Sequence, residues 1–511
     1  MNNIVIRKER EEDYKKTELM TMRAFWNIHG PGCNEHLLVH KLRNSEVYLP
    51  EISRVAEMDG KIVGTIMYSK AEVYDGEIVH EVITFGPLAV EPTAQSFGIG
   101  GMLLRETIKL ATEAGYLGIC IFGEPDYYPR YGFVNAEKFG ITDEEGNNYD
   151  AFMAYELTDN GFANIKGKFK EAEIVGQCED EEEIEAFTRQ FPYYEPLTFK
   201  CQWLHKEKLG RISNVQKNQY TIQFWEEQLP AKLKGNFYNG KQKFPVVGDY
   251  VTFDYNPKGD SRILEVCERK SILKRPFPRD HAVRKVEEQE MVANVDYVFI
   301  VTSLNYDFSV NRVLRYAAMA RQGNAEPVVI LTKTDICENA EAYVKKIRDS
   351  IPKTDVYAVS AIKNDGIDCL SRYMKPGKTI ALLGSSGVGK STLINTLAGQ
   401  CIMETKSVRE KDSKGRHTTT YRQMFMLNSG VTIIDTPGMR EFGIRDLDEG
   451  LNATFSDIVD LSSQCKFGNC THTSEPGCAV KEAIRSGILS EKRLKTYQSL
   501  CKEGKSIVRR T

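Results

Sequence analysis

The sequence has no long apolar run and no basic character overall. None of its hydrophobic stretches approaches the roughly 20 residues that a membrane-spanning helix needs. Its first ten residues, MNNIVIRKER, contain no apolar signal core. The net charge of −3 over 511 residues gives no global attraction to nucleic acid, so a surface for RNA has to be local. We therefore expect a cytoplasmic protein of several domains, without a membrane partner.

Cysteine is present at twelve positions, and in a cytoplasmic chain such residues are more often free thiols or metal ligands than disulfides. Three of them gather with one histidine within fourteen residues, at Cys465, Cys470, His472 and Cys478. Three thiolates and one imidazole suit a tetrahedral Zn²⁺ with no open position, which is typical of a structural metal. Reduced cysteines without a metal are the alternative.

A glycine-rich loop follows the apolar run 379–383 and precedes a helix-like segment. Backbone amides of such a loop point at a phosphate, its lysine reaches the β- and γ-phosphates, and its last hydroxyl can bind Mg²⁺. The loop comprises Gly384, Ser385, Ser386, Gly387, Val388, Gly389, Lys390 and Ser391, the magnesium candidate, and Thr392 comes next. The alternative is a glycine-rich turn without a ligand.

Two segments that follow apolar strands are suited to a guanine base. Thr332, Lys333 and Asp335 come after the run 328–331, and Asp335 can accept hydrogen bonds from the N1 and N2 hydrogens of guanine. Adenine lacks this donor pair, so the segment favours GTP over ATP; a simple helix cap is the alternative. Ser360 and Ala361, after another strand, would support the base through their backbone.

A third segment, at the end of the apolar strand 431–435, is suited to the metal and the γ-phosphate. There Asp435 can hold Mg²⁺ through water, and the Gly438 amide can sense the γ-phosphate. Residue 439 is Met, where Ras-like enzymes carry the glutamine that orients water, so we expect slow intrinsic hydrolysis.

The order of these segments is unusual, because the base-recognition residues precede the phosphate loop. Upstream, residues 206–279 carry 15 Lys and Arg against 8 Asp and Glu. This stretch contains five short strand-like runs, which suit a small barrel of the oligonucleotide-binding (OB) type. Its aromatic residues either stack on RNA bases or fill the barrel, and they are Tyr220, Phe224, Trp225, Phe237 and Tyr238.

The barrel, the permuted order and the Cys/His cluster together resemble the circularly permuted RsgA-type (YjeQ) GTPases, over about residues 209–500. The resemblance rests on the segments 245–249, 269–275, 294–305, 384–391, 415–420 and 435–438. It implies GTP hydrolysis stimulated by the small ribosomal subunit, rRNA binding, a role in late subunit assembly and a zinc module. Thr332 departs from the usual Asn of GTPases, so we expect weaker anchoring of that loop. His417 is the candidate to replace the missing glutamine, with an inert loop residue as the alternative.

The N-terminal part contains a second glycine-rich turn, 95–101, between a strand and an amphipathic helix. With the strand 119–122 and the segment 127–133, residues 4 to about 157 resemble GNAT-family N-acetyltransferases. That resemblance implies acetyl-CoA as cosubstrate, with Tyr128 protonating the leaving thiolate unless it only packs; the general base is open, and Glu81 is one candidate. The implied acetyl-CoA contacts are Leu88, Ala89, Val90, Gln95, Gly98, Ile99, Gly100 and Gly101.

The fold expected is multidomain α/β. The predicted order is a GNAT α+β domain over 1–160, an acidic linker or exposed helix face over 161–205, an OB-type barrel over 206–279, a permuted P-loop GTPase over 280–447 and a small zinc-binding domain with a helical tail over 448–511. We expect a monomer that is both GTPase and N-acetyltransferase. The alternative is an RNA-binding assembly scaffold whose N-terminal domain senses acetyl-CoA without catalysis.

Overall fold

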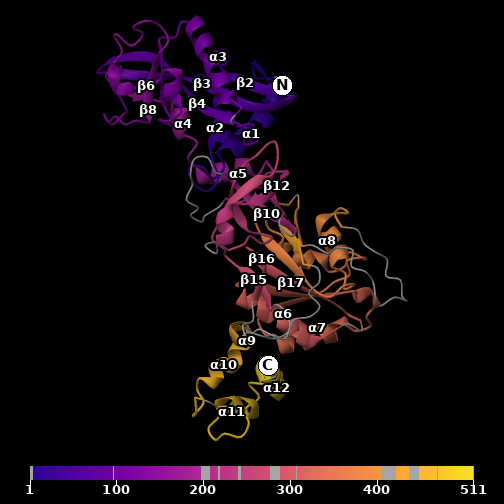
Figure 1. Ribbon diagram of the computed structural model, residues 1–511. Helices are drawn as coiled ribbons and strands as arrows, with labels where there is room; N and C mark the ends of the chain where they lie inside the picture. The colour runs from indigo at the N-terminus through magenta and orange to yellow at the C-terminus, as the bar shows by residue number, and fades with distance from the viewer. Residues whose placement is uncertain are drawn as a thin grey trace. The chain divides into compact units, whose positions relative to one another are not determined.

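The computed structural model describes residues 4–95, 97–196, 208–216, 219–239, 243–276, 288–305, 308–403, 422–427, 429–436, 448–468 and 470–509. The chain divides into two compact units, Met1–Thr198 and Phe199–Thr511, and each is described by itself (Figure 1). Among the helices of these described ranges, none is long and apolar enough to cross a membrane.

The first unit is built on a mixed sheet whose central strands β3 and β4 form one long antiparallel hairpin. The strand order is β1-β2-β3-β4-β5-β8-β6, with β9 added to the edges of β3 and β7. The strands are β1 (Ile4–Arg7), β2 (Arg54–Met58), β3 (Lys61–Asp75), β4 (Ile78–Val90), β5 (Gly118–Phe122), β6 (Val134–Asn135), β7 (Ile141–Thr142), β8 (Phe152–Glu156) and β9 (Gly167–Lys170).

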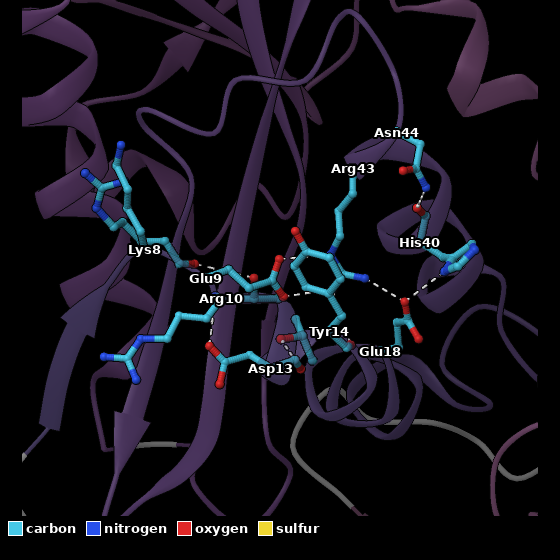
Figure 2. A network of polar contacts seen from close by, with 12 residues as sticks. Lys8, Glu9, Arg10, Asp13, Tyr14, Glu18, His40, Arg43 and Asn44 are labelled. Atoms are coloured by element: carbon cyan, nitrogen blue, oxygen red, sulfur yellow. Dashed lines mark hydrogen bonds and ion pairs between the residues drawn. The ribbon is translucent and has the colours of Figure 1, made fainter.

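Helices α1 (Tyr14–Phe25) and α2 (Glu35–Arg43) are joined by a buried charge cluster (Figure 2). The Arg43 guanidinium donates to Glu9 at 2.7 and 2.9 Å and to Glu18 at 2.6 Å, and its plane lies over the Tyr14 ring. His40 contacts the same Glu18 carboxylate at 3.0 Å. All three charged side chains of Glu9, Glu18 and Arg43 are less than a tenth exposed, so this cluster fixes the angle between the two helices.

The described part of the segment expected to be an acidic linker or exposed helix face, 161–196, lies within the first unit. Strand β9 joins the sheet, and the helices α4 (Glu173–Gly176) and α5 (Glu181–Thr188) follow it. The acidic face of α5 is exposed, whereas Phe187 packs with Leu37 of α2 and with Cys178. The His36 ring is buried against Phe187 and contacts the Thr188 hydroxyl at 2.8 Å. The acidic stretch is therefore an amphipathic cover of α2.

The second unit begins with a closed five-stranded barrel, as the sequence predicts. The five predicted runs are its strands, paired in the order β11-β12-β14-β13-β10 and closed by β10 with β11. Tyr220, Phe224 and Phe237 are buried in the barrel core, whereas Tyr238 is 61% exposed. The strands are β10 (Lys208–Gln216), β11 (Gln219–Phe224), β12 (Glu227–Leu233), β13 (Tyr250–Asp254) and β14 (Ser261–Val266).

A sheet of the P-loop type follows, parallel except for its edge strand β21, and the hairpin β15 (Ile272–Pro276) and β16 (Glu288–Ala293) connects it to the barrel. Near-continuous apolar runs form the strands because both sheet faces are covered. The strand order is β21-β22-β20-β17-β18-β19. The elements are β17 (Tyr297–Ser303), α6 (Val310–Gln322), β18 (Glu326–Thr332), α7 (Ala340–Ser350), β19 (Asp355–Ala358), β20 (Thr379–Leu383), α8 (Lys390–Ala398), β21 (Gln423–Met426) and β22 (Thr432–Asp435).

Four helices close the chain: α9 (Asp448–Thr454), α10 (Ser456–Ser462), α11 (Ala479–Arg485) and α12 (Glu491–Arg509). Helix α9 packs on α6 of the GTPase sheet, and Phe455 and Ile458 bury their side chains in the same hydrophobic cluster as α6. Arg493 of α12 pairs with Asp457 at 2.6 and 2.7 Å and donates to the Thr454 carbonyl. The Cys/His segment lies between α10 and α11, so these packed helices position it.

Candidate functional site

The predicted nucleotide segments meet at one edge of the parallel sheet. Strands β22, β20, β17, β18 and β19 run side by side in the same direction. The phosphate loop follows β20, Thr332 ends β18, Ser360 follows β19, and Asp435 ends β22. Because the carboxyl ends of parallel strands share one edge, all four segments face the region where open α/β sheets bind ligands.

The phosphate loop requires its glycines. A Cβ at Gly384 would lie 2.2 Å from the Val301 carbonyl oxygen, and Gly387 and Gly389 have positive φ angles of 80° and 97°. Helix α8 starts at Lys390, whose ammonium donates to the carbonyls of Gly384 at 2.8 Å and Ser385 at 3.0 Å. The loop therefore curves around the lysine ammonium, as a phosphate cradle does.

The base-recognition segment is tied directly to the phosphate loop. The Thr332 hydroxyl is buried and donates to the Val388 carbonyl at 2.5 Å. The Lys333 ammonium donates to the Gly387 carbonyl at 2.8 Å, from a residue in the left-handed backbone region with φ 64°. Thr332 thus anchors the segment although it stands where other GTPases carry Asn, so the weaker anchoring expected from the sequence is offset by a short hydroxyl bond.

Asp335 is held by its neighbour strand. The Ser360 hydroxyl is buried and donates to Asp335 Oδ1 at 2.7 Å. The carbonyl of Ala361 accepts from Thr396 of α8 at 3.2 Å, so the helix that follows the phosphate loop also holds this turn. The Asp335 carboxylate is half-buried and has one oxygen engaged, which leaves acceptor capacity for a donor pair such as guanine N1 and N2.

Asp435 has the surroundings of a cation ligand. Its side chain is 4% exposed, and its Oδ1 atom has no hydrogen-bond partner within the described chain. Burial raises the pKa of Asp435, and the positive charge of Lys390 acts in the opposite direction. A buried carboxylate without a partner is costly unless a cation compensates it. Asp435 and Ser391, the second residue of α8, therefore fit a hard oxygen-ligated ion such as Mg²⁺.

Arg312 is a residue of this site that the sequence did not reveal. It lies in the first turn of α6 and donates from Nη1 to the Ser385 hydroxyl at 2.9 Å. No local motif marks Arg312, because it stands 73 positions before Ser385 in the chain. Two other predicted residues, His417 and Gly438, lie outside the described residues.

The Cys/His cluster is assembled. The ligand atoms of Cys465, Cys470, His472 and Cys478 all lie within 4.8 Å of one another. The Sγ atoms of Cys465 and Cys478 are 3.9 Å apart, and they lie 3.7 and 3.4 Å from His472 Nδ1. A tetrahedral zinc with bonds of about 2.3 Å to sulfur and about 2.1 Å to nitrogen requires separations near 3.8 and 3.6 Å. The donor set therefore fits Zn²⁺.

The histidine tautomer follows from its neighbour on α10. The Ser462 hydroxyl donates its proton to the Ile458 carbonyl at 2.6 Å, and its oxygen lies 3.0 Å from His472 Nε2. Nε2 therefore carries the hydrogen and donates it to Ser462, which leaves the Nδ1 lone pair directed at the two thiols. Burial lowers the pKa of His472, which also favours the neutral, ligating ring.

In the first unit, the predicted acetyl-donor residues lie where β4 and β5 separate. These parallel strands have one register pair in the described chain, Ile83 opposite Ile119. Leu88, Ala89 and Val90 continue β4 past this point, and within the described residues only β3 pairs with them. Backbone groups on their other edge, apart from the Val90 carbonyl, are thus available to an amide-containing ligand. Gln95 donates to the Val90 carbonyl at 3.2 Å and links β4 to the glycine-rich turn.

The turn leads into α3 (Ile99–Glu113), with Gly98 in the left-handed region at φ 80° as its N-cap. A Cβ at Gly100 or Gly101 would lie 2.6 Å from the Tyr127 hydroxyl or 2.2 Å from the Tyr131 hydroxyl. These glycines thus let the two tyrosines approach the first turn of α3.

Tyr128, from the same segment, packs between Phe85 and Phe133 at ring distances of 5.8 and 5.7 Å. Burial raises the pKa of Tyr128, and the charge of Glu124 raises it further, so the phenol stays protonated. Glu81, the candidate base, is more than half exposed and pairs with Lys70.

Residues 266–445 match the family model described as RsgA GTPase. The small ribosomal subunit biogenesis GTPase RsgA 2 of Listeria monocytogenes is 43% identical over 296 residues, which cover 58% of this chain and 83% of the relative. The chain belongs to the RsgA GTPase family. The RsgA of Methanosarcina acetivorans is also 43% identical, with 79% of its length covered. The RsgA part of the chain is similar to the crystal structure of YjeQ from Thermotoga maritima, at 28% identity, with coverage of 58% of this chain and 98% of that one and a TM-score of 0.45.

Residues 18–133 match the model described as Acetyltransferase (GNAT) family, so this RsgA-family chain carries a GNAT domain in its first unit. A structure of the GNAT protein YhbS from Escherichia coli in complex with CoA is 23% identical, covers 34% of this chain and 93% of that one, and has a TM-score of 0.31. Both family assignments confirm the resemblances seen in the sequence.

Proposed function

We propose that the second unit hydrolyses GTP during assembly of the small ribosomal subunit and that hydrolysis is stimulated by that subunit. The observation that supports this most is the double link between the base segment and the phosphate loop, Thr332 to Val388 and Lys333 to Gly387. Two such hydrogen bonds hold the base-recognition segment and the phosphate loop together, so both can line a single nucleotide pocket. The relatives named for small-subunit biogenesis supply the cellular task.

Each predicted residue has a distinct role in this proposal. Asp335 accepts from guanine, with Ser360 and Ala361 holding its turn, and Lys390 neutralises the β- and γ-phosphates. Ser391 and Asp435 would hold Mg²⁺, which supplies charge stabilisation at the phosphates when it is bound. Amides of the glycine-rich loop, from Gly384 to Thr392, cradle the phosphate oxygens.

Two roles fall on residues outside the described ranges. We assign Gly438 to sensing the γ-phosphate and His417 to orienting water once the ribosomal subunit is bound. The residue after Gly438 is Met439, whose thioether cannot orient water, so a partner has to complete the site.

GTP turnover by the full chain, with and without purified small subunits, tests the proposal. We expect slow turnover alone and an increase on the order of a hundredfold or more with subunits, since completing such a site from outside has large effects. His417→Ala should lose most of the increase and keep its nucleotide affinity. Turnover that is unchanged by subunits would contradict the assigned partner, and absent turnover would contradict the hydrolase.

The barrel supplies the proposed contact with rRNA. Its 206–279 segment is locally basic, and Tyr238 and Phe244 are 61% and 49% exposed with their rings 5.9 Å apart. An exposed aromatic pair among lysines can stack bases while the ammonium groups bind phosphates. Tyr220, Phe224 and Phe237 take no part, because they fill the barrel.

The Cys/His module is proposed as a structural Zn²⁺ site at the end of the chain. Its four protein ligands complete a tetrahedron and leave no position for a substrate. Zinc binding in such modules contributes directly to folding, so removal of the metal should unfold the local segment while the GTPase sheet persists. We expect the intact chain to act as a cytoplasmic monomer.

The first unit is proposed to transfer acetyl from acetyl-CoA to an amine. Tyr128 is assigned as the general acid, whose protonated phenol would give its proton to the leaving thiolate. Leu88, Ala89 and Val90 would hold the donor by the edge that faces away from β3, with the turn from Gln95 through Gly98, Ile99, Gly100 and Gly101 at its phosphates.

Labelled acetyl-CoA offered to the full chain with ribosomal proteins and polyamines tests this activity, with Tyr128→Phe as the control. Transfer that Tyr128→Phe lowers by about a hundredfold supports it. Binding of acetyl-CoA without transfer to any acceptor would favour the sensor hypothesis.

A further inference from the structure

Strand β10 of the barrel is shared between two partners along one edge. Residues Lys208 to Arg211 pair with β13 inside the barrel. The pairing of β10 with β11 has a bulge between Ile212 and Asn214 and continues from Asn214 to Gln216. On the edge that β13 leaves, Asn214 pairs with Gln423 of β21 in the GTPase sheet. Bulges bend a strand and redirect it, and here the bend carries β10 from the barrel to the GTPase edge.

The pair of Asn214 with Gln423 lies in the same row of the sheet as Asp435, the proposed magnesium ligand. Gln423 is opposite Asn214 on one side and opposite Asp435 on the other. Asp435 in turn is opposite Leu382, two residues before the phosphate loop starts at Gly384. One continuous row of backbone pairs therefore runs from the barrel to the nucleotide edge.

At the end away from the nucleotide edge, the barrel is bound to the GTPase sheet by several buried hydrogen bonds. Arg211 is 7% exposed and donates to the hydroxyls of Thr379 at 2.8 Å and Thr432 at 3.3 Å, the first residues of β20 and β22. It also donates to the carbonyls of Asn294 and Gly248. At the nucleotide end the described residues show one pair with β21, Val215 packs against the apolar cluster of the GTPase sheet, and the buried Oδ1 of Asn214 has no hydrogen-bond partner among the described residues. The contact of β10 with the GTPase sheet thus has several buried polar bonds at one end and fewer at the other.

We propose that residues Asn214–Gln216 are a built-in effector segment of the GTPase, whose pairing with β21 depends on the bound nucleotide. This inference rests on the proposed binding of GTP. An unpaired strand edge is a template for another strand, and binding by strand addition is a general mode of recognition. Here the barrel of the same chain takes the edge of β21.

The coupling follows from the position of Asp435. A triphosphate with its cation gives the buried carboxylate a partner and so fixes the end of β22. Strand β21, paired with β22 along four residues, is fixed with it, and the single bridge to Asn214 becomes more stable. With the diphosphate, the end of β22 is less constrained and the bridge opens more often. The barrel is thereby held more tightly at the nucleotide edge in the triphosphate state, while Arg211 keeps its other end in place.

Hydrogen exchange of the full chain tests this proposal. The protein is loaded with GDP or with guanosine 5′-(β,γ-imido)triphosphate plus Mg²⁺, and bound nucleotide is quantified in each sample. We expect the amides of Asn214–Gln216 to exchange about fivefold more slowly, or slower still, in the triphosphate state. The amides of Lys208–Gly210, paired within the barrel, should not change. Equal rates at Asn214–Gln216, or slower exchange with GDP, would overturn the inference.

Two proline variants sharpen the result. Asn214→Pro should abolish the nucleotide-dependent difference along β10. Glu227→Pro, at the first residue of β12 where proline is tolerated and where the partner strand is β11, should retain it. A difference that persists in folded Asn214→Pro would overturn the proposal, and if that variant does not fold, the comparison in the parent chain decides. Failure to bind either nucleotide would contradict the proposed GTPase itself, whereas bound nucleotide with equal rates contradicts only the coupling.

Discussion

Replacing Thr332 by Val tests the link between base recognition and the phosphate loop. The hydroxyl has two acceptors, Val388 at 2.5 Å and Thr302 at 3.4 Å, and its one proton serves the shorter contact. Valine keeps the shape of the side chain but leaves the Val388 carbonyl without this donor, next to the phosphate site. A buried acceptor deprived of its donor costs about 1–3 kcal/mol.

That cost appears mainly as weaker nucleotide binding, because the carbonyl belongs to the loop that must hold the phosphates. At about 1.4 kcal/mol per factor of ten, we expect Thr332→Val to bind GDP and a GTP analogue about 5- to 150-fold more weakly. Fluorescent-nucleotide titration measures the affinities. Thr332→Asn, which restores an amide donor, should recover most of the loss.

Thr396→Val is the matched control, since its hydroxyl also donates to a turn of the site but at 3.2 Å and with a second acceptor, Thr392, in its own helix. We expect a loss of threefold or less there, about 0.6 kcal/mol. If Thr332→Val folds normally and binds both nucleotides as the parent does, the link has no energetic role and the pocket argument is wrong.

Three further predictions concern stability and the metal. Burial lowers the pKa of His36 to about 4 from an ordinary 6.5. As the pH falls, the unfolded state therefore takes up a proton before the folded state does. The free energy of unfolding present above pH 6.5 decreases toward pH 4, by about 2 kcal/mol at pH 5. Urea titrations at pH 8 and 5 should show this loss in the parent and not in His36→Gln. Arg43→Ala should destabilise the first unit by about 3–5 kcal/mol in urea titrations, because it removes the guanidinium from two buried carboxylates and leaves Glu18 only its contact with His40 (Figure 2); a loss below 1 kcal/mol would refute this. Ser462→Ala should weaken zinc binding about 10- to 100-fold in chelator competition, with Ser463→Ala unchanged.

The sequence was sufficient for features that local chemistry determines. Apolar runs gave the parallel strands, and the phosphate loop could be placed because Gly384 to Lys390 is contiguous. The ligand types of the metal cluster were likewise visible in their density. Contacts between distant segments were not predictable. Arg312 reaches Ser385 across 73 positions, and the tautomer of His472 depends on Ser462 at the end of α10.

Amphipathic segments were the hardest to interpret. Charges dominate the acidic stretch before the barrel, which suggests a linker or an exposed helix face, yet Phe187 and Ile184 pack α5 on α2. In the barrel, some aromatic side chains fill the core and others of similar type are exposed to solvent. Phe237 is 1% exposed and Tyr238 is 61% exposed, and only the three-dimensional course of the chain separates these neighbours.

The most direct test of one shared pocket is base selectivity after Asp335→Asn. Full-length parent and variant are titrated with fluorescent GTP and XTP, whose base carries oxygen in place of the guanine amino group. The parent should prefer GTP by on the order of a hundredfold, and the variant, whose amide donates to that oxygen, should prefer XTP. A variant that still binds GTP as tightly as the parent, with no gain for XTP, would show that Asp335 does not hold the base.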